Sequence, residues 1–233
     1  MHCLTCRDKG MLGGCPTCGK TAQFSTEARD VPDEVLDAVA IPEFYKGNVW
    51  SKQTLIDTHA DVTAKTKLEQ YASILTRIHQ IFSSGSIPNK SFMVISSPGS
   101  GKLTWAYACM QEALRHGHSV VPIIDNTEFK RLSIISSDRM TSKFLKSQKY
   151  SIEDYLAADV MFMTIDPDNF QTAYRTVSSV LNKRTRAGKP TFIISRFSLE
   201  QISLMDYTQQ FTKDIQAKQQ QDRNKYLVLI GGI

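Results

Sequence analysis

The sequence predicts an α/β fold: a parallel sheet flanked by helices, with a small cysteine-rich segment before it. Two observations predict the sheet. Short apolar runs alternate with segments of helical periodicity along most of the chain, which is the order that builds parallel sheets. Glycine or polar residues directly follow several of these runs, where strands of a parallel sheet end and ligands bind. A chain of 233 residues, 41% of them hydrophobic, can form one main domain and a small appendage.

Four cysteines near the start of the sequence form two Cys-x2-Cys pairs with glycines between them. They are Cys3, Cys6, Cys15 and Cys18. Four thiolates at such spacing are the ligand set of a tetrahedral Zn²⁺ site, which would be structural because cysteine fills every position. Disulfide bonds are the alternative. We expect a zinc knuckle at residues 1–22, a lead-in at 23–60 and the main domain at 61–233.

The main domain opens with an amphipathic helix. In residues 67–82 apolar side chains recur at three- and four-residue spacing. Residues 83–89 contain serine, glycine and proline, which end the helix. Phe92 to Ile95 then form an apolar run with the length and propensity of a strand.

A glycine-rich turn follows this strand and leads into a helix from about Lys102 to Arg115. Gly99 and Gly101 would let backbone N–H groups approach a phosphate, and the helix N-terminus adds a favourable dipole. Lys102 would reach the β- and γ-phosphates of ATP or a related nucleotide. The predicted contacts are Pro98, Gly99, Ser100, Gly101, Lys102, Leu103 and Thr104. An ordinary glycine-rich turn with an exposed lysine is the alternative.

The turn departs at both ends from the phosphate-loop pattern G-x-x-x-x-G-K-[ST]. Ser96 stands at the first glycine, and Leu103 stands at the Ser/Thr that binds Mg²⁺. Thr104 follows one residue later, but one helical residue is a rotation of about 100°, so its hydroxyl need not point at the metal.

Two further strands supply candidate catalytic groups. Residues 119–124 are a predicted strand, and Asp125 would cap the next helix. Residues 159–166 are a predicted buried strand that ends in Asp166, which we expect to hold Mg²⁺ through water. Asp168 is the second choice, and a plain turn aspartate is the alternative.

The last third of the chain continues the alternation with a helix at 170–184. Arg184 and its basic neighbours Arg186 and Lys189 would face a phosphate or simply solvent. Residues 191–195 and 226–230 are predicted strands. Ser195 ends the first of these and joins Lys102 and Asp166 as a candidate catalytic residue.

The overall charge and hydropathy set limits on partners and location. Lys and Arg exceed Asp and Glu by 28 − 23 = 5, which is compatible with nucleic acid but does not demonstrate binding. No apolar run approaches the roughly 18 residues of a membrane span, and the N-terminus lacks a signal-peptide core. We therefore expect no membrane partner and a cytoplasmic location.

These motifs together resemble the DnaC-type helicase loaders, a branch of the AAA+ ATPases that includes the DnaI and IstB proteins. The resemblance covers nearly the whole chain. It rests on the cysteine pairs and on the sequence SPGSGK of the glycine-rich turn. It also rests on three further stretches: Ile41-Pro42-x-x-Tyr45, Gly117-His118-Ser119-Val120 and Lys189 to Glu200. The last segment resembles the family's sensor-1 region.

The resemblance implies an AAA+-type sheet, ATP with Mg²⁺ bound between subunits of a ring or spiral, contact with single-stranded DNA, and delivery of a replicative DNA helicase. The zinc knuckle would grip the helicase. Four departures argue for weak hydrolysis or for binding without turnover. They are Leu103 in the loop, a single acid followed by Pro167 after the buried strand, Arg196 in place of the sensor asparagine, and only Lys213 where an arginine finger is expected. The competing prediction is therefore a hydrolysis-deficient AAA+-like adaptor that acts through protein contacts. The pattern of divergence suggests a phage member.

Overall fold

The structure is a computed structural model. It describes residues 30–58, 65–125, 127–129, 131–132, 150–165, 170–205, 213, 216 and 226–231. The four cysteines of the predicted zinc knuckle lie outside these residues, and so do Asp166 and Asp168.

Four parallel strands form one sheet in the order β2-β3-β1-β4. They are β1 (Ser91–Ser96), β2 (Met161–Ile165), β3 (Thr191–Ser195) and β4 (Tyr226–Gly231). The register places Ser195 beside Ile95 on one side and beside Ile165 on the other. The carboxyl ends of these strands therefore meet at one edge, and the predicted parallel α/β sheet is confirmed.

The predicted strand at residues 119–124 is not a regular strand. Isolated parallel bridges join Val120 to Val160 and Ile124 to Met163. Pro122 lies between the two bridges and has no backbone N–H, so it cannot donate to a continuous ladder. The segment nevertheless runs beside β2 and delivers Asp125 to the carboxyl edge of the sheet.

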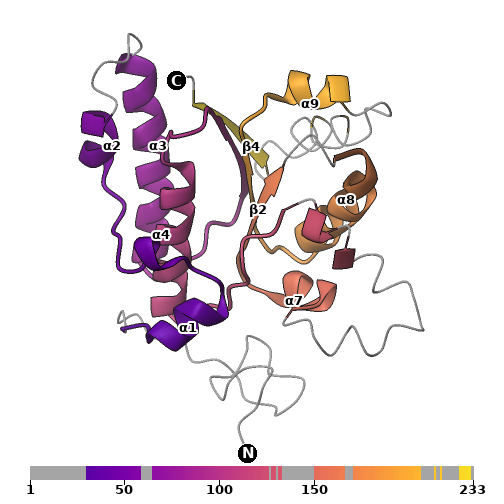
Figure 1. Cartoon of the computed structure of the whole chain (residues 1–233), viewed down its shortest axis with the longest axis horizontal. Helices are drawn as coiled ribbons and strands as arrows, with labels where there is room; N and C mark the ends of the chain where they lie inside the picture. Colours follow the sequence, from indigo (N-terminus) through magenta and orange to yellow (C-terminus); the bar gives the residue numbers. More distant parts are fainter. Residues whose placement is uncertain are drawn as a thin grey trace, which may run out of the picture.

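Helices cover both faces of the sheet (Figure 1). They are α1 (Asp33–Ala38), the 3₁₀ turn η1 (Glu43–Tyr45), α2 (Lys52–Thr58), α3 (Lys65–Ser83), α4 (Lys102–Arg115), α7 (Ile152–Ala157), α8 (Phe170–Arg186) and α9 (Leu199–Met205). Figure 1 shows α3 and α4 side by side on one side of the sheet, with α7 and α8 on the other. The helices predicted at 67–82, 102–115 and 170–184 are all present. None of the described helices is long and apolar enough to span a membrane.

Alternate side chains of β1 enter two separate hydrophobic cores. Phe92 and Val94 belong to the core under α3 and α4, whereas Met93 and Ile95 belong to the core under α8. This alternation is the two-residue period of a strand, and burial on both faces explains why the strand has no polar side. Trp105 of α4 is fully buried in the first core, and its indole N–H donates to the carbonyl of Leu75 at 2.9 Å.

The described part of the lead-in packs against the first core. Leu36, Ile41, Trp50 and Leu55 are all buried members of that core. The Trp50 indole N–H also donates to the hydroxyl of Thr76 on α3 at 3.0 Å. These contacts fix α2 beside the loop between β1 and α4, so the lead-in helps to build the candidate site.

Arg184 is neither phosphate-facing nor solvated, and both predictions for it were wrong. Its side chain is 1% exposed, and its guanidinium donates to the carbonyls of Tyr155, Ala158 and Pro190 at 2.7, 2.7 and 2.6 Å. A further N–H bonds the Thr191 hydroxyl at 3.0 Å. The residue therefore joins α7, α8 and the start of β3. Arg186, two residues later, is exposed as the solvent alternative predicted.

Candidate nucleotide-binding site

The loop between β1 and α4 has the backbone of a tight phosphate cradle. Gly99 and Gly101 both adopt positive φ, at 82° and 73°, where a side chain is strained. At Gly101 a Cβ atom would also lie 2.9 Å from the Cδ1 atom of Leu55. Nothing lies within 4 Å of a Cβ at Gly99. Backbone shape therefore favours glycine at both positions, and at Gly101 an added Cβ atom would also have to displace the end of the Leu55 side chain.

Buried hydroxyl groups brace the loop from below. Ser96 and Ser100 are 3% and 1% exposed, and their hydroxyl oxygens share a hydrogen bond. The phenol oxygen of Tyr71 on α3 lies 3.2 Å from the Ser96 hydroxyl. Burial raises the pKa of Tyr71, although its bonds to the two serines act in the opposite direction, so the phenol keeps its proton. Ser96, which departs from the glycine of the pattern, thus has a structural role in this loop.

Lys102 is bound to the loop itself. Its ammonium donates to the carbonyls of Ser96 and Ser97 at 2.9 and 2.6 Å. Burial lowers the pKa of Lys102 from its ordinary value. Both acceptors are neutral, so an anionic phosphate is a stronger partner and would attract the ammonium away from them.

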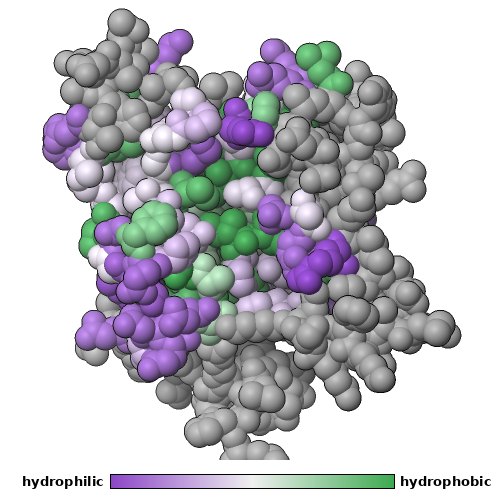
Figure 2. All heavy atoms as spheres, in the orientation of Figure 1, coloured by the Kyte–Doolittle hydropathy of each residue, from purple (hydrophilic) through white to green (hydrophobic). Residues whose placement is uncertain are grey.

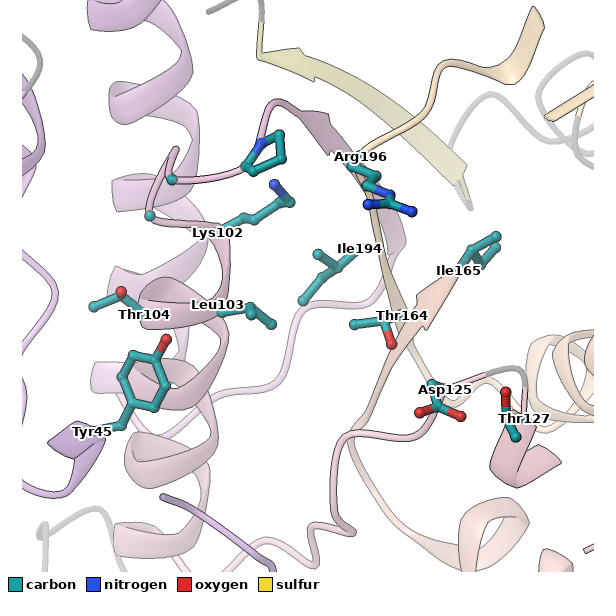
Figure 3. Close-up of a pocket in the computed structure, with 13 residues that line it drawn as sticks. Tyr45, Lys102, Leu103, Thr104, Asp125, Thr127, Thr164, Ile165, Ile194 and Arg196 are labelled. Carbon is teal, nitrogen blue, oxygen red and sulfur yellow. The ribbon is translucent and has the colours of Figure 1, made fainter. Parts of the chain in front are cut away.

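A cavity of about 560 Å³ opens in front of the loop, at the carboxyl edge of the sheet. The loop and the start of α4 form one wall, the ends of β2 and β3 form the other, and η1 contributes Tyr45 (Figure 3). Figure 2 shows hydrophobic side chains in the middle of the displayed face with polar ones around them. The lining residues are Tyr45, Pro98, Gly99, Gly101, Lys102, Leu103, Thr104, Asp125, Thr127, Thr164, Ile165, Ile194 and Arg196.

Six of the seven residues predicted to bind nucleotide line this cavity. The exception is Ser100, which braces the loop from beneath. Leu103 lines the cavity with 38% of its side chain exposed, and Figure 3 shows it extending toward Ile194. Thr104 extends from the other side of α4, near Tyr45.

The described residues do not offer a fitting Mg²⁺ site on the loop. Magnesium takes oxygen ligands, and Leu103 has none at the position that normally supplies a hydroxyl. Within the described ranges, no group of three or more His, Cys, Asp or Glu residues could hold a metal ion. The magnesium prediction therefore depends on Asp166, which lies outside them.

Ser195 and Arg196 end β3 with different roles. Ser195 is buried; its hydroxyl donates to the carbonyl of Phe197 at 2.9 Å and accepts the N–H of Phe197 at 3.0 Å. It is not among the residues that line the cavity, whereas Arg196 is. The Arg196 guanidinium lies over the Phe197 ring, with Cζ 4.6 Å from the ring centroid. The structure thus turns Arg196, rather than the predicted Ser195, toward the cavity.

Sequence reasoning missed the function of two residues that shape the cavity. Tyr45 lines it and stacks on Tyr107 with 4.4 Å between ring centroids. Gln111 of α4, only 4% exposed, donates to the Tyr45 carbonyl at 2.9 Å and accepts the Gly47 N–H at 2.8 Å. The Ile41-Pro42-x-x-Tyr45 motif could have drawn attention to Tyr45. No local pattern marks Gln111, because the two partners that tie it to the lead-in, Tyr45 and Gly47, lie more than sixty residues away.

A parallel sheet with a glycine-rich loop between an inner strand and a helix, facing a cavity at the carboxyl edge, is the arrangement found in P-loop α/β folds. No family model matches the chain, and no curated protein matches it.

Solved structures do match. DnaI is 14% identical, with a TM-score of 0.50, and the match covers 82% of this chain and 95% of that one. A proposed primosome component from Streptococcus pyogenes serotype M3 is 15% identical, with a TM-score of 0.51 and coverages of 82% and 90%. The DnaC helicase loader is 15% identical, with a TM-score of 0.49 and coverages of 81% and 99%. The predicted resemblance to the DnaC-type loaders is thus confirmed at the level of the fold, and the low sequence identity is consistent with a divergent member.

Proposed function

We propose that the protein is an ATP-binding helicase loader that engages a replicative DNA helicase and single-stranded DNA during replication initiation. The observation that carries the proposal is the loop itself. It holds Lys102 and two positive-φ glycines against a cavity, on a fold that matches DnaI over 95% of that chain. The sequence resemblance to the DnaC-type loaders supplies the helicase and the single-stranded DNA as partners.

The described residues suit the binding of a nucleotide. Backbone N–H groups around Gly99 and Gly101, at the N-terminus of a helix of fourteen residues, would hold the phosphates. Lys102 would leave the carbonyls of Ser96 and Ser97 for a phosphate oxygen. Tyr45, which stacks on Tyr107, lies farther along the cavity wall, where it is suited to contact the rest of the nucleotide.

The second candidate is an adaptor that binds nucleotide without turnover. Leu103 favours it, because this side chain faces the cavity at the position of the metal-binding hydroxyl. The first candidate also includes contact with single-stranded DNA and Asp166 as the Mg²⁺ ligand. In it, Ser195 contributes to catalysis through the turn that carries Arg196. Nucleotide-dependent contact with a partner is common to both.

The test combines three measurements on the full-length protein. A fluorescent ATP analogue is titrated into wild type and Lys102→Ala, hydrolysis is followed with and without single-stranded DNA, and copurification with a hexameric replicative helicase is scored. Binding that Lys102→Ala weakens about a hundredfold, together with helicase capture, supports the loader. Helicase capture with no hydrolysis supports the adaptor. Unchanged binding in Lys102→Ala would reject the phosphate loop.

The zinc knuckle and the ring or spiral assembly are parts of the same proposal. Cys3, Cys6, Cys15 and Cys18 would hold one Zn²⁺ per chain and present the knuckle to the helicase. Metal analysis of the wild type should give one zinc per chain, and less would reject the site. Cys15→Ser should lose the zinc and the helicase contact but keep nucleotide binding.

A further inference from the structure

We propose that Arg196 supplies part of the positive charge that Mg²⁺ provides in most phosphate loops, so that this site does not require a divalent cation to bind a nucleoside triphosphate. The inference rests on the proposed nucleotide binding and concerns how its charge is balanced. It starts from the apolar side chain of Leu103, which removes the loop's own metal ligand.

Arg196 stands in the right place to contact the phosphates. The β1–β3 register pairs Ile95 with Ser195, so Arg196 follows β3 beside the point where Ser96 begins the loop. The ammonium of Lys102 lies at that same point, bonded to the Ser96 carbonyl. Adjacent strands are about 4.8 Å apart, so the two cations approach the cavity from neighbouring strand ends. Figure 3 shows Arg196 at the end of β3 on the opposite side of the cavity from Lys102, whose ammonium turns back toward the loop.

The turn after β3 orients the Arg196 side chain. Both hydrogen bonds between the Ser195 hydroxyl and the Phe197 backbone close this turn. They place the Phe197 ring under the guanidinium, where the cation–π contact steadies it. A guanidinium offers a planar fork of N–H donors that matches two phosphate oxygens, and it keeps its charge at any physiological pH. Ser195 is therefore a positioning residue for Arg196.

The charge of the cavity fits an anion. Among the described lining residues, Lys102 and Arg196 are the cations and Asp125 is the acid. One oxygen of the Asp125 carboxylate already accepts the Glu128 N–H at 2.8 Å, and Figure 3 shows Asp125 away from Lys102. Leu103 and Ile194 lie between the two cations and the lower part of the cavity, and their apolar surface strengthens charge pairing nearby.

The experiment measures the affinity of a fluorescent non-hydrolysable ATP analogue for the full-length protein, once with Mg²⁺ and once with EDTA. The proposal expects the two dissociation constants of the wild type to agree within about threefold, because Arg196 acts in both conditions. Arg196→Gln should weaken binding in EDTA by about tenfold and should make Mg²⁺ beneficial. Arg196→Lys keeps the positive charge but lacks the planar fork of donors. Its dissociation constant in EDTA should therefore lie between those of the wild type and Arg196→Gln.

The matched control is Arg186→Gln, an exposed arginine at the end of α8 outside the cavity, which should leave both constants unchanged. Wild-type binding that requires Mg²⁺ would overturn the inference and leave nucleotide binding intact. Equal metal independence of Arg196→Gln and wild type would overturn it as well. Absence of binding in every condition would instead reject the proposed function.

Discussion

The side chains of Arg184 and Arg196 lie at opposite ends of β3 and have different surroundings. Arg184 bonds the Thr191 hydroxyl where β3 starts, and its other donors go to buried carbonyls of α7 and of the chain around it. Arg196 follows the last residue of β3 and lines a solvent-accessible cavity. At the amino edge of the sheet a guanidinium therefore joins several elements, whereas at the carboxyl edge one lines the cavity.

The difference lies in the acceptors. Carbonyl groups at the ends of helices and strands often need a hydrogen-bond donor from elsewhere. At the amino edge the Arg184 guanidinium is that donor for three such carbonyls. At the carboxyl edge the Ser195 hydroxyl and the Phe197 backbone bond each other, and the Arg196 guanidinium lies over the Phe197 ring and lines the cavity. The surrounding backbone groups thus place one arginine in a buried structural role and the other in the lining of the cavity.

The largest expected effect is on stability at the amino edge. Arg184→Met would leave the carbonyls of Tyr155, Ala158 and Pro190 buried without donors, at about 1–3 kcal/mol each. We expect the free energy of unfolding to fall by more than about 3 kcal/mol in urea denaturation. Arg196→Met and the exposed Arg186→Met are the matched controls and should change it by less than about 0.5 kcal/mol. Equal losses in all three variants would contradict the division between the two edges.

The sequence predicted the parallel sheet well because the evidence for it is local. Apolar runs mark β1, β2 and β3, and the glycine pattern marks the loop before α4. The prediction of a regular strand at 119–124 was wrong because it relied on the β-propensity of the valines and isoleucines there. Pro122 lacks the backbone N–H that a continuous ladder needs. The roles of Arg184 and Gln111 could not be predicted, because each depends on carbonyls supplied by distant segments.

The second effect tests whether the loop is held by backbone shape or by packing. Gly101→Ala and Gly99→Ala share the backbone strain of a positive φ, about 1–2 kcal/mol. Only the first also brings a Cβ atom to 2.9 Å from Leu55. Gly101→Ala should therefore lower the free energy of unfolding by about 1 kcal/mol more than Gly99→Ala. Similar losses would show that α2 adjusts freely and that the carboxyl edge is less tightly held than the contacts indicate.

The third effect is the pH dependence of binding through Lys102. Burial lowers the pKa of this ammonium below its ordinary 10.5 in the folded protein, so it loses its proton at a lower pH than an exposed lysine. Affinity for the fluorescent ATP analogue should therefore fall as the pH rises through that lowered pKa. In the same window the unfolded chain holds more protons, so this group makes the free energy of unfolding rise with pH.

Lys102→Arg is the control for that pH profile. A guanidinium keeps its charge throughout the accessible range, so whatever binding this variant retains should not decline there. Binding measured across the alkaline range on both proteins checks the difference. Parallel pH profiles would assign the decline to another group and would leave Arg196 as the principal cation of the cavity.

The smallest expected effect is at Leu103. It tests how far nucleotide binding and turnover at the carboxyl edge depend on Mg²⁺. Leu103→Thr restores an oxygen ligand at the loop position where Leu103 now faces the cavity. Leu103→Val has the same branched shape without the hydroxyl and is the matched control. If the missing hydroxyl limits turnover, the threonine variant alone should show Mg²⁺-dependent phosphate release, raised by up to about tenfold. Its affinity for the ATP analogue should also improve on addition of Mg²⁺, whereas that of the valine variant should not.

No gain in either measurement would mean that turnover is limited by Asp166 or by the missing arginine finger, because the loop of the threonine variant would already have its metal ligand. A gain that persists in Leu103→Thr combined with Arg196→Gln would show that metal and guanidinium are alternatives for the same phosphate charge.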